Sequence, residues 1–351
     1  MFNLLKKEYN RFIIKKFKKA YCKNIDEQIF KDVIIEKIYQ MGWNQYLFML
    51  NNFLENWREY YYKNIDTIDE KLEKLYKNLD EESIRFAKAL FDRNIFILPH
   101  KSRQDFLMLN TKMLYTQEEQ NGLIQLEKVK SNYKLANNKQ VDNYLILYKS
   151  GFSFIENIAG EYIKGKDFID GGAFIGDTAL VLNEYKAGNI FCFEPNENNK
   201  NLLKETIKLN NVENTIKIVS KGLSDSDKTV YFKANDVDSG GNICQNETEL
   251  SIETTSIDKF VSENNIKLGL IKLDIEGSEY DAIVGAKETI LKYKPVLLIS
   301  VYHTLKDFIE IKPMIEEWTN DYKFIIRPTF PLMLNAEFML IAYPAELENV
   351  R

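Results

Sequence analysis

The chain has 351 residues, a formal net charge of −5 and 45% hydrophobic residues. This length exceeds what one hydrophobic core usually organises, so two domains are expected. The near balance of charge gives no general reason to expect binding to nucleic acid.

Cysteine usage and the start of the chain bear on the compartment. The three cysteines, Cys22, Cys192 and Cys244, lie far apart without metal-ligand spacing, and an odd count suits a reducing compartment. The first residues are too charged for a signal peptide, because Lys6 and Lys7 follow at once. No uncharged apolar stretch approaches the ~18–20 residues that span a bilayer. We therefore expect a cytoplasmic protein.

Glycine and proline divide the chain into two unlike parts. Thirteen of the 15 glycines and six of the seven prolines come after residue 150. Apolar residues in the first part recur at helical spacing instead, as at Leu47, Leu50, Leu54 and Trp57. We predict a helical domain over residues 1–95, a mixed connector over 96–150 and a catalytic domain over 151–351.

The first helix is strongly basic. Residues 1–23 hold eight basic side chains against one acid, Glu8, and have an apolar stripe on the other face. Such a helix can lie on an anionic membrane surface, here the inner face of the membrane. Alternatively, the stripe packs on other N-terminal helices or on a second subunit of a homo-oligomer. We favour packing, because stripes of this size usually serve as core.

The second part alternates buried strands with helices. Strands are predicted at Lys166–Asp170, Asn189–Glu194, Thr215–Ser220, Leu268–Asp274 and Pro295–Tyr302. Helices are predicted at 177–187, 197–211, 256–265 and 279–293. This alternation predicts an α/β fold with a doubly wound parallel sheet, and such sheets bind ligands at the carboxyl ends of their strands.

The first motif is a glycine-rich turn after the first strand. It places Asp170 directly before a turn that contains Gly172 and Gly176, a spacing that fits S-adenosylmethionine binding. Asp170 can hold the ammonium of that ligand. A dinucleotide site is the rival interpretation, but an acid at this point repels a pyrophosphate. A tight turn that binds no ligand is the third interpretation of this motif.

Two further candidates follow the next strands. Glu194 ends the second strand, where a carboxylate can accept both ribose hydroxyls. A solvated strand-end glutamate is the alternative. Ser224 and Asp225 follow the third strand, where adenine contacts are expected, although a plain turn explains them equally well.

Candidates for catalysis follow the fourth and fifth strands. Asp274 lies where an acid can orient or deprotonate a hydroxyl nucleophile. Asp274 and Glu276 could instead hold a divalent cation. His303 closes the next strand and is a candidate base, since an unperturbed histidine titrates near neutrality, but a structural role has about equal weight.

Over residues 150–344 the sequence resembles the FkbM-type methyltransferase family. Lys272-Leu273-Asp274-Ile275-Glu276-Gly277-Ser278-Glu279 is similar to the most specific signature of that family, and the segments that begin at Asp170, Phe193, Lys221 and Tyr302 are similar to its other motifs. The resemblance implies strand order 3-2-1-4-5-7-6 and methyl transfer from S-adenosylmethionine, with S-adenosylhomocysteine as product. The implied acceptor is a hydroxyl of a sugar or other small molecule.

Other functions remain open from the residues. An RNA methyltransferase has only the basic first helix in its favour, and no Asn-Pro-Pro-Tyr-like segment for base-amine methylation follows the fourth strand. A nicotinamide-dependent oxidoreductase is disfavoured by the acidic motifs. A binding scaffold without catalysis is the third alternative. The leading hypothesis is an O-methyltransferase that acts on a glycan or glycoconjugate precursor.

Overall fold

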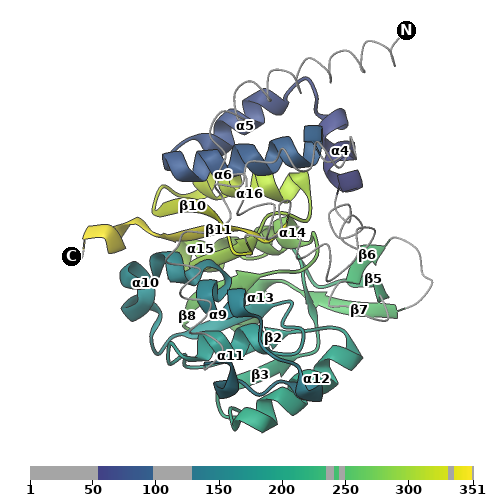
Figure 1. The fold of residues 1–351 in the computed structure, drawn as a ribbon, viewed down its shortest axis with the longest axis vertical. Coiled ribbons are helices and arrows are strands. Elements are labelled where there is room, and N and C mark those ends of the chain that lie inside the picture. The colour runs from purple at the N-terminus through teal and green to yellow at the C-terminus, as the bar shows by residue number, and fades with distance from the viewer. Residues whose placement is uncertain (1–53, 98–128, 235–240, 245–249, 331–335, 350–351) are drawn as a thin grey trace, which may run out of the picture.

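The computed structural model describes residues 54–97, 129–234, 241–244, 250–330 and 336–349 of the chain. The predicted basic helix over residues 1–23 lies outside these residues. Within them the structure is mixed α/β, as predicted, with helices on both faces of a central sheet (Figure 1). In the described part of the chain, no helix has the length and apolar character needed to cross a membrane.

The central sheet has seven strands, in the order β10-β11-β9-β8-β1-β2-β3. Their bounds are β1 Asp167–Gly171, β2 Ile190–Phe193, β3 Ile216–Val219, β8 Leu268–Leu273, β9 Val296–Ser300, β10 Tyr322–Pro328 and β11 Phe338–Pro344. The last strand, β11, pairs antiparallel with both β9 and β10, whereas the other pairs are parallel. Counted along the sheet, this is the expected order 3-2-1-4-5-7-6.

Alternation along the strands builds a core on each face, since successive strand side chains point to opposite sides. On one side pack Phe168, Leu270 and Leu298, together with α10 Glu156–Ile163, α11 Asp177–Asn183 and α12 Glu197–Asn210. On the other side pack Ile169, Ile271 and Ile299, together with α13 Ile257–Glu263, α14 Glu279–Val284, α15 Lys287–Tyr293 and α16 Leu305–Trp318. Burial on both faces explains why these strands are continuous apolar runs.

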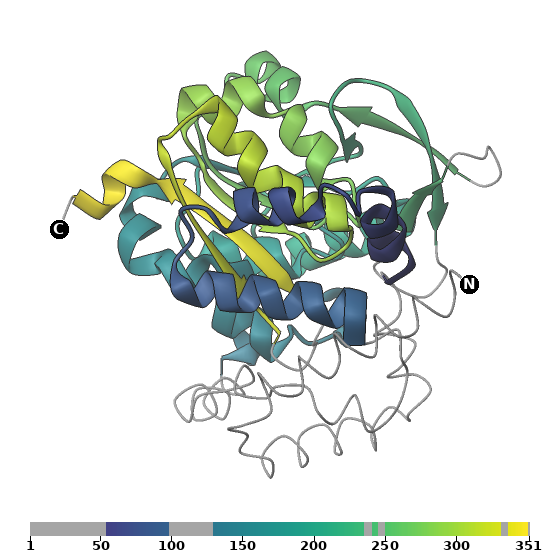
Figure 2. The same cartoon turned by 90° about the horizontal axis from the view of Figure 1, so that it is seen from above.

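The N-terminal helices pack on the second of these faces. They are α4 Leu54–Lys63, α5 Ile68–Tyr76 and α6 Glu81–Asp92, followed by a π-helical turn at Arg93–Ile97. In Figures 1 and 2 they lie beside α16 and β10, and their buried side chains belong to the same hydrophobic core as those helices and strands. A helical N-terminal region is therefore present. The domain boundaries at residues 95 and 150 stay predictions.

Short elements complete the described chain. Before the sheet come η4 Lys130–Asn132, η5 Ala136–Asn138, α9 Asn143–Tyr148 and η6 Lys149–Ile155, and η7 Ala345–Asn349 follows it. A second sheet, in the order β4-β7-β5-β6, was not expected from the sequence. Its strands are β4 Gly222–Leu223, β5 Thr229–Ala234, β6 Gly241–Cys244 and β7 Leu250–Thr255.

The single helix predicted over 279–293 is wrong, because α14 and α15 are separate helices that meet at Gly285. A Cβ at Gly285 would lie 2.3 Å from the carbonyl oxygen of Ser224. The break therefore lets the backbone pass close to the turn that follows β4.

Candidate active site

A cavity of about 300 Å³ opens at the carboxyl ends of β1, β2 and β8. Among the predicted residues, Gly172, Glu194, Asp274 and Glu276 line it. Asp170, Gly176, Ser224, Asp225 and His303 lie close by in the chain but are not part of its lining. The topology thus brings the motifs of four strands to one edge of the sheet, as expected for this architecture.

The glycines of the first turn are required by the protein itself. Gly172 has a φ of +73°, and a Cβ there would lie 1.9 Å from the carbonyl oxygen of Asp274. Gly176 has a φ of +90°, and its Cβ would lie 2.5 Å from Leu203 on α12. Both positions favour glycine for backbone conformation and packing. Only Gly172 also faces the cavity.

Asp170 is sealed from the cavity by Lys272. Asp170 is fully buried, and its carboxylate lies 3.0 Å from Lys272 Nζ. The same Nζ donates to the carbonyl oxygens of Gly171 and Gly172, at 3.2 and 3.1 Å. Burial lowers the pKa of Lys272, but Asp170 and Asp274 outweigh this and raise it overall. Lys272 thus supplies the cation that the sequence motif assigned to a ligand ammonium.

Glu194 is held by the turn and still faces the cavity. Its carboxylate accepts hydrogen bonds from the backbone N–H groups of Phe174, at 3.0 Å, and Asn196, at 2.8 Å. The side chain of Asn199 also hydrogen-bonds this carboxylate. A carboxylate has about four acceptor positions, so one remains for a ligand hydroxyl. Burial raises the pKa of Glu194 to about 7.

Ser224 and Asp225, the candidates predicted after the third strand, form a turn outside the cavity. Ser224 Oγ lies 3.2 Å from Asp225 Oδ1, which also accepts from Lys228 Nζ at 2.7 Å. The cavity wall on this side consists instead of apolar and hydroxyl-bearing residues, namely Leu223, Ile252 and Thr254. All three belong to the small sheet that the sequence did not predict, and Ile252 and Thr254 lie in no motif that could indicate them.

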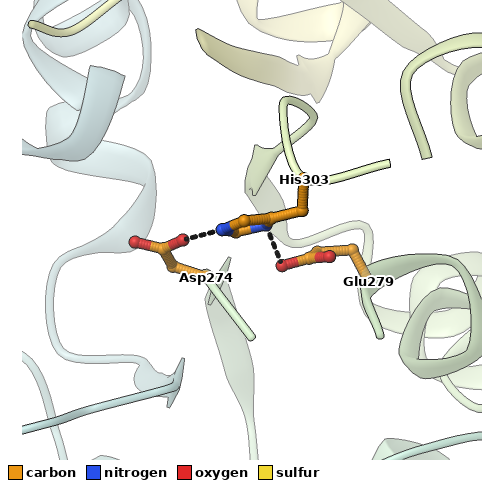
Figure 3. A group of neighbouring side chains, drawn as sticks. All are labelled: Asp274, Glu279 and His303. Atoms are coloured by element: carbon orange, nitrogen blue, oxygen red, sulfur yellow. Dashed lines mark ion pairs between the residues drawn. The ribbon is translucent and has the colours of Figure 1, made fainter. Parts of the chain in front are cut away.

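Asp274, Glu276 and Glu279 surround the ring of His303. The Nδ1 atom lies 3.0 Å from Glu279, and Nε2 lies 3.4 Å from Asp274 and 3.5 Å from Glu276. Figure 3 shows the ring between Asp274 and Glu279. Glu279 also accepts from the backbone N–H groups of Ile275 and Gly277, and so fixes the acidic turn.

This setting does not favour His303 as the base. Burial lowers the pKa of His303, but Glu279, Asp274 and Glu276 outweigh it and raise the pKa to about 10. The ring is therefore an imidazolium near neutral pH and has no lone pair with which to accept a proton. With 2% exposure it lies behind the cavity wall, where its charge helps Lys272 to hold the pKa of Asp274 below its usual value.

Asp274, Glu279 and His303 also offer ligand atoms that lie within 4.8 Å of one another. These are metal-ligating residue types. However, the two ring nitrogens face different carboxylates, with the ring between them (Figure 3). A metal binds one nitrogen, so this arrangement suits a bridging imidazolium better than a common ion.

Asp177, Tyr302 and Glu337 are further residues of the site that the sequence analysis did not name as candidates. Asp177 and Glu337 line the cavity with Tyr302, whose hydroxyl lies 3.3 Å from both Asp274 Oδ1 and Glu337 Oε1. Glu337 directly precedes β11, which runs antiparallel to its neighbours. Its position at the carboxyl edge of the parallel strands follows from that direction, and this could have been the signal for it.

A second cavity of about 260 Å³ adjoins the first. Both are lined by Asp177, Thr178, Lys272, Asp274 and Glu337. The far wall of the second comes from α9 and from the β10–β11 connection, where the rings of Tyr144 and Phe330 have centroids 4.2 Å apart. The two cavities therefore share one acidic wall and differ at their far ends.

Comparison with known proteins finds a methyltransferase family whose model matches part of the chain. The family described as "Methyltransferase FkbM domain" matches residues 170–327, in agreement with the sequence-based recognition. No curated protein matches the chain.

One solved structure shares the fold of this chain. Methyltransferase FkbM from Methylobacillus flagellatus KT is similar with a TM-score of 0.52 and 18% identity, over 82% of this chain and 61% of that one. This chain thus spans less than two thirds of that protein. Precorrin-6y C5,15-methyltransferase from Geobacter metallireducens GS-15 has a TM-score of 0.37 and 11% identity, over 61% and 95% of the two chains. The O-methyltransferase from Bacillus cereus, solved with SAH, has a TM-score of 0.34 and 9% identity, over 64% of this chain and 90% of that one. Only the first score is high enough to establish a shared fold.

Proposed function

We propose, from the premise that residues 170–327 form a methyltransferase FkbM domain, that the protein transfers a methyl group from S-adenosylmethionine to a hydroxyl oxygen. The acceptor we propose is a sugar or a glycoconjugate precursor. The observation that carries the proposal is the acidic cavity at the carboxyl ends of β1, β2 and β8.

The charge of this cavity fits the methyl donor. Among the described residues, its lining holds five carboxylates and a single lysine, namely Asp177, Glu194, Asp274, Glu276, Glu337 and Lys272. S-adenosylmethionine carries a sulfonium and an ammonium, which carboxylates attract, whereas the pyrophosphate of a dinucleotide is repelled. The same acidity weighs against an RNA acceptor, whose backbone is a polyanion.

Individual residues fit the parts of the donor. The free acceptor position of Glu194 suits a ribose hydroxyl, and Leu223, Ile252 and Ile275 provide an apolar wall for adenine. Burial raises the pKa of Asp274, but Lys272 and His303 outweigh it and hold that pKa below its usual value. Asp274 therefore stays ionised and can orient a hydroxyl or pair with the positive end of the donor. When bound, the donor supplies a methyl group activated by the sulfonium.

The second cavity is the proposed acceptor compartment. It adjoins the donor cavity, and its wall combines carboxylates and hydroxyls with the Tyr144–Phe330 aromatic pair. Carboxylates accept hydrogen bonds from sugar hydroxyls, and aromatic rings offer apolar surface for the C–H faces of a saccharide.

Thermal stabilisation tests the donor assignment. S-adenosylhomocysteine at about 100 times its dissociation constant stabilises the fold by about 2.7 kcal/mol, whereas NAD should leave the melting temperature unchanged. Glu194→Ala should reduce the shift, and Glu205→Ala, an exposed glutamate of α12, should keep it. Stabilisation by NAD alone would contradict the proposal.

Methyl transfer to saccharides tests the rest. Isotope transfer from labelled donor should be screened over saccharides and nucleotide sugars, with and without a chelator. Loss of transfer with the chelator would promote Asp274 and Glu276 to metal ligands. Donor binding without transfer to any acceptor would favour the binding-scaffold alternative.

A further inference from the structure

Glu337 stands at the junction of the two cavities. Its side chain is one of five residues that line both, and it is partly exposed to them. In the described part of the chain, the one hydrogen bond found for its carboxylate comes from Tyr302, at 3.3 Å. A group placed between donor and acceptor compartments is within reach of both reacting partners.

The backbone holds Glu337 in an unusual conformation. Its φ is +58°, which is in the left-handed region that glutamate rarely adopts. The carbonyl oxygen accepts from Thr329 twice, from N–H at 2.8 Å and from Oγ1 at 3.0 Å. Backbone strain that is fixed in this way is concentrated at functional sites, because the surrounding structure must maintain it.

Two carboxylates, those of Asp274 and Glu337, face the single hydroxyl proton of Tyr302. Tyr302 has one hydroxyl proton and faces Asp274 and Glu337 at equal distances. Lys272 and His303 keep Asp274 ionised, so an additional proton is best held by Glu337. The other charged groups that face this junction are Asp142 of the loop before α9, Asp177 of α11 and Glu276 of the acidic turn.

From this position we propose that Glu337 is the general base that takes the proton from the acceptor hydroxyl. The inference rests on the proposed function. As the acceptor oxygen forms its bond to the methyl carbon, the carbon–sulfur bond breaks with its electron pair going to sulfur. The hydroxyl proton passes to a Glu337 carboxylate oxygen and from there to water. A base works best when its pKa lies near the working pH. Burial and the neighbouring Asp274 raise the pKa of Glu337 to about 7.

The first test follows the protonation of Glu337 through the pH dependence of stability, and it needs neither the methyl donor nor the acceptor. The ordinary value for this carboxyl is 4.5, and burial raises its pKa in the folded state. The stabilisation that comes from protonating Glu337 in the folded state is therefore fully present below pH 4.5 and is lost as the pH rises to about 7. E337Q keeps the shape without the charge, so its melting temperature should exceed that of wild type increasingly between pH 5 and 7. Equal or lower stability of E337Q at pH 8 would overturn the proposal.

The second test measures turnover. E337Q should lose about 10²–10⁴-fold in turnover while its dissociation constant for S-adenosylhomocysteine stays within about threefold of wild type. Glu205→Gln, on the exposed face of α12, should match wild type in both. Near-normal turnover of E337Q refutes the base but leaves the methyltransferase intact. If wild type does not bind S-adenosylhomocysteine, the proposed function itself fails.

Discussion

At the scale of single residues, Gly172 shows that a glycine of a ligand-binding motif can be required by the fold as well as by a ligand. We expect Gly172→Ala to destabilise the fold by roughly 2–4 kcal/mol, because its Cβ meets the Asp274 carbonyl oxygen and its φ is positive. Urea unfolding measures the change.

Gly160 provides the matched control for this substitution. It lies in α10, and a Cβ there would meet nothing within 4 Å. Gly160→Ala should therefore gain about 0.5–1 kcal/mol. If both substitutions change the free energy of unfolding in the same direction, the close approach of Gly172 to the Asp274 carbonyl oxygen is not the cause of the change.

The buried Asp170–Lys272 pair provides a second prediction. Lys272→Met leaves the Asp170 carboxylate buried without its cation, which should cost about 3–5 kcal/mol. The double variant Asp170→Asn with Lys272→Met should recover much of this loss. A double-mutant cycle in urea measures the coupling, and additive losses would mean that the two side chains act independently.

Sequence motifs predicted part of this site and missed the rest for a geometric reason. Glu194 and Asp274 end or follow buried strands and do line the cavity. Asp170 lies one residue before the end of β1, but its side chain is covered by Lys272 of the neighbouring strand β8. The cover depends on the pairing of two strands about 100 residues apart, and a local motif contains no information about it.

At the scale of elements, α4 supports the site from outside the family match. Trp57 Nε1 donates to the carbonyl oxygen of Tyr302 at 2.8 Å, and its ring packs against Phe308 of α16. Trp57→Phe keeps an aromatic ring but leaves that buried carbonyl without its donor. We expect a loss of about 1–3 kcal/mol and lower turnover with little change in S-adenosylhomocysteine affinity.

Tyr62→Phe on the same helix is the control, because Tyr62 is 40% exposed. It should change stability by less than about 0.5 kcal/mol. Wild-type turnover in Trp57→Phe would show that α4 stabilises the fold without positioning Tyr302.

The elements themselves were predictable to different degrees. The five parallel strands were placed to within two residues at each end, because burial on both faces makes them continuous apolar runs. The small sheet was missed, since strands as short as Gly222–Leu223 give no periodic signal. The break between α14 and α15 was missed because its cause is a distant contact, between Gly285 and Ser224.

At the scale of the whole molecule, charge is distributed very unevenly. The net charge is only −5 over the full chain, yet the cavity gathers five carboxylates around a single lysine among the described residues. The overall composition therefore gives little information about the ligand. The strand topology brings acids that are distant in the sequence to one edge of the sheet, and so sets the local electrostatic potential.

The contact between Trp57 and Tyr302 spans 245 positions in the chain. During translation, α4 emerges long before the strand and helix against which it packs. At typical synthesis rates this interval is on the order of tens of seconds. Throughout that time α16 and β10, on which α4, α5 and α6 pack in the described part of the chain, have not yet been made. We therefore expect these helices to complete their packing only after α16 and β10 have been synthesised.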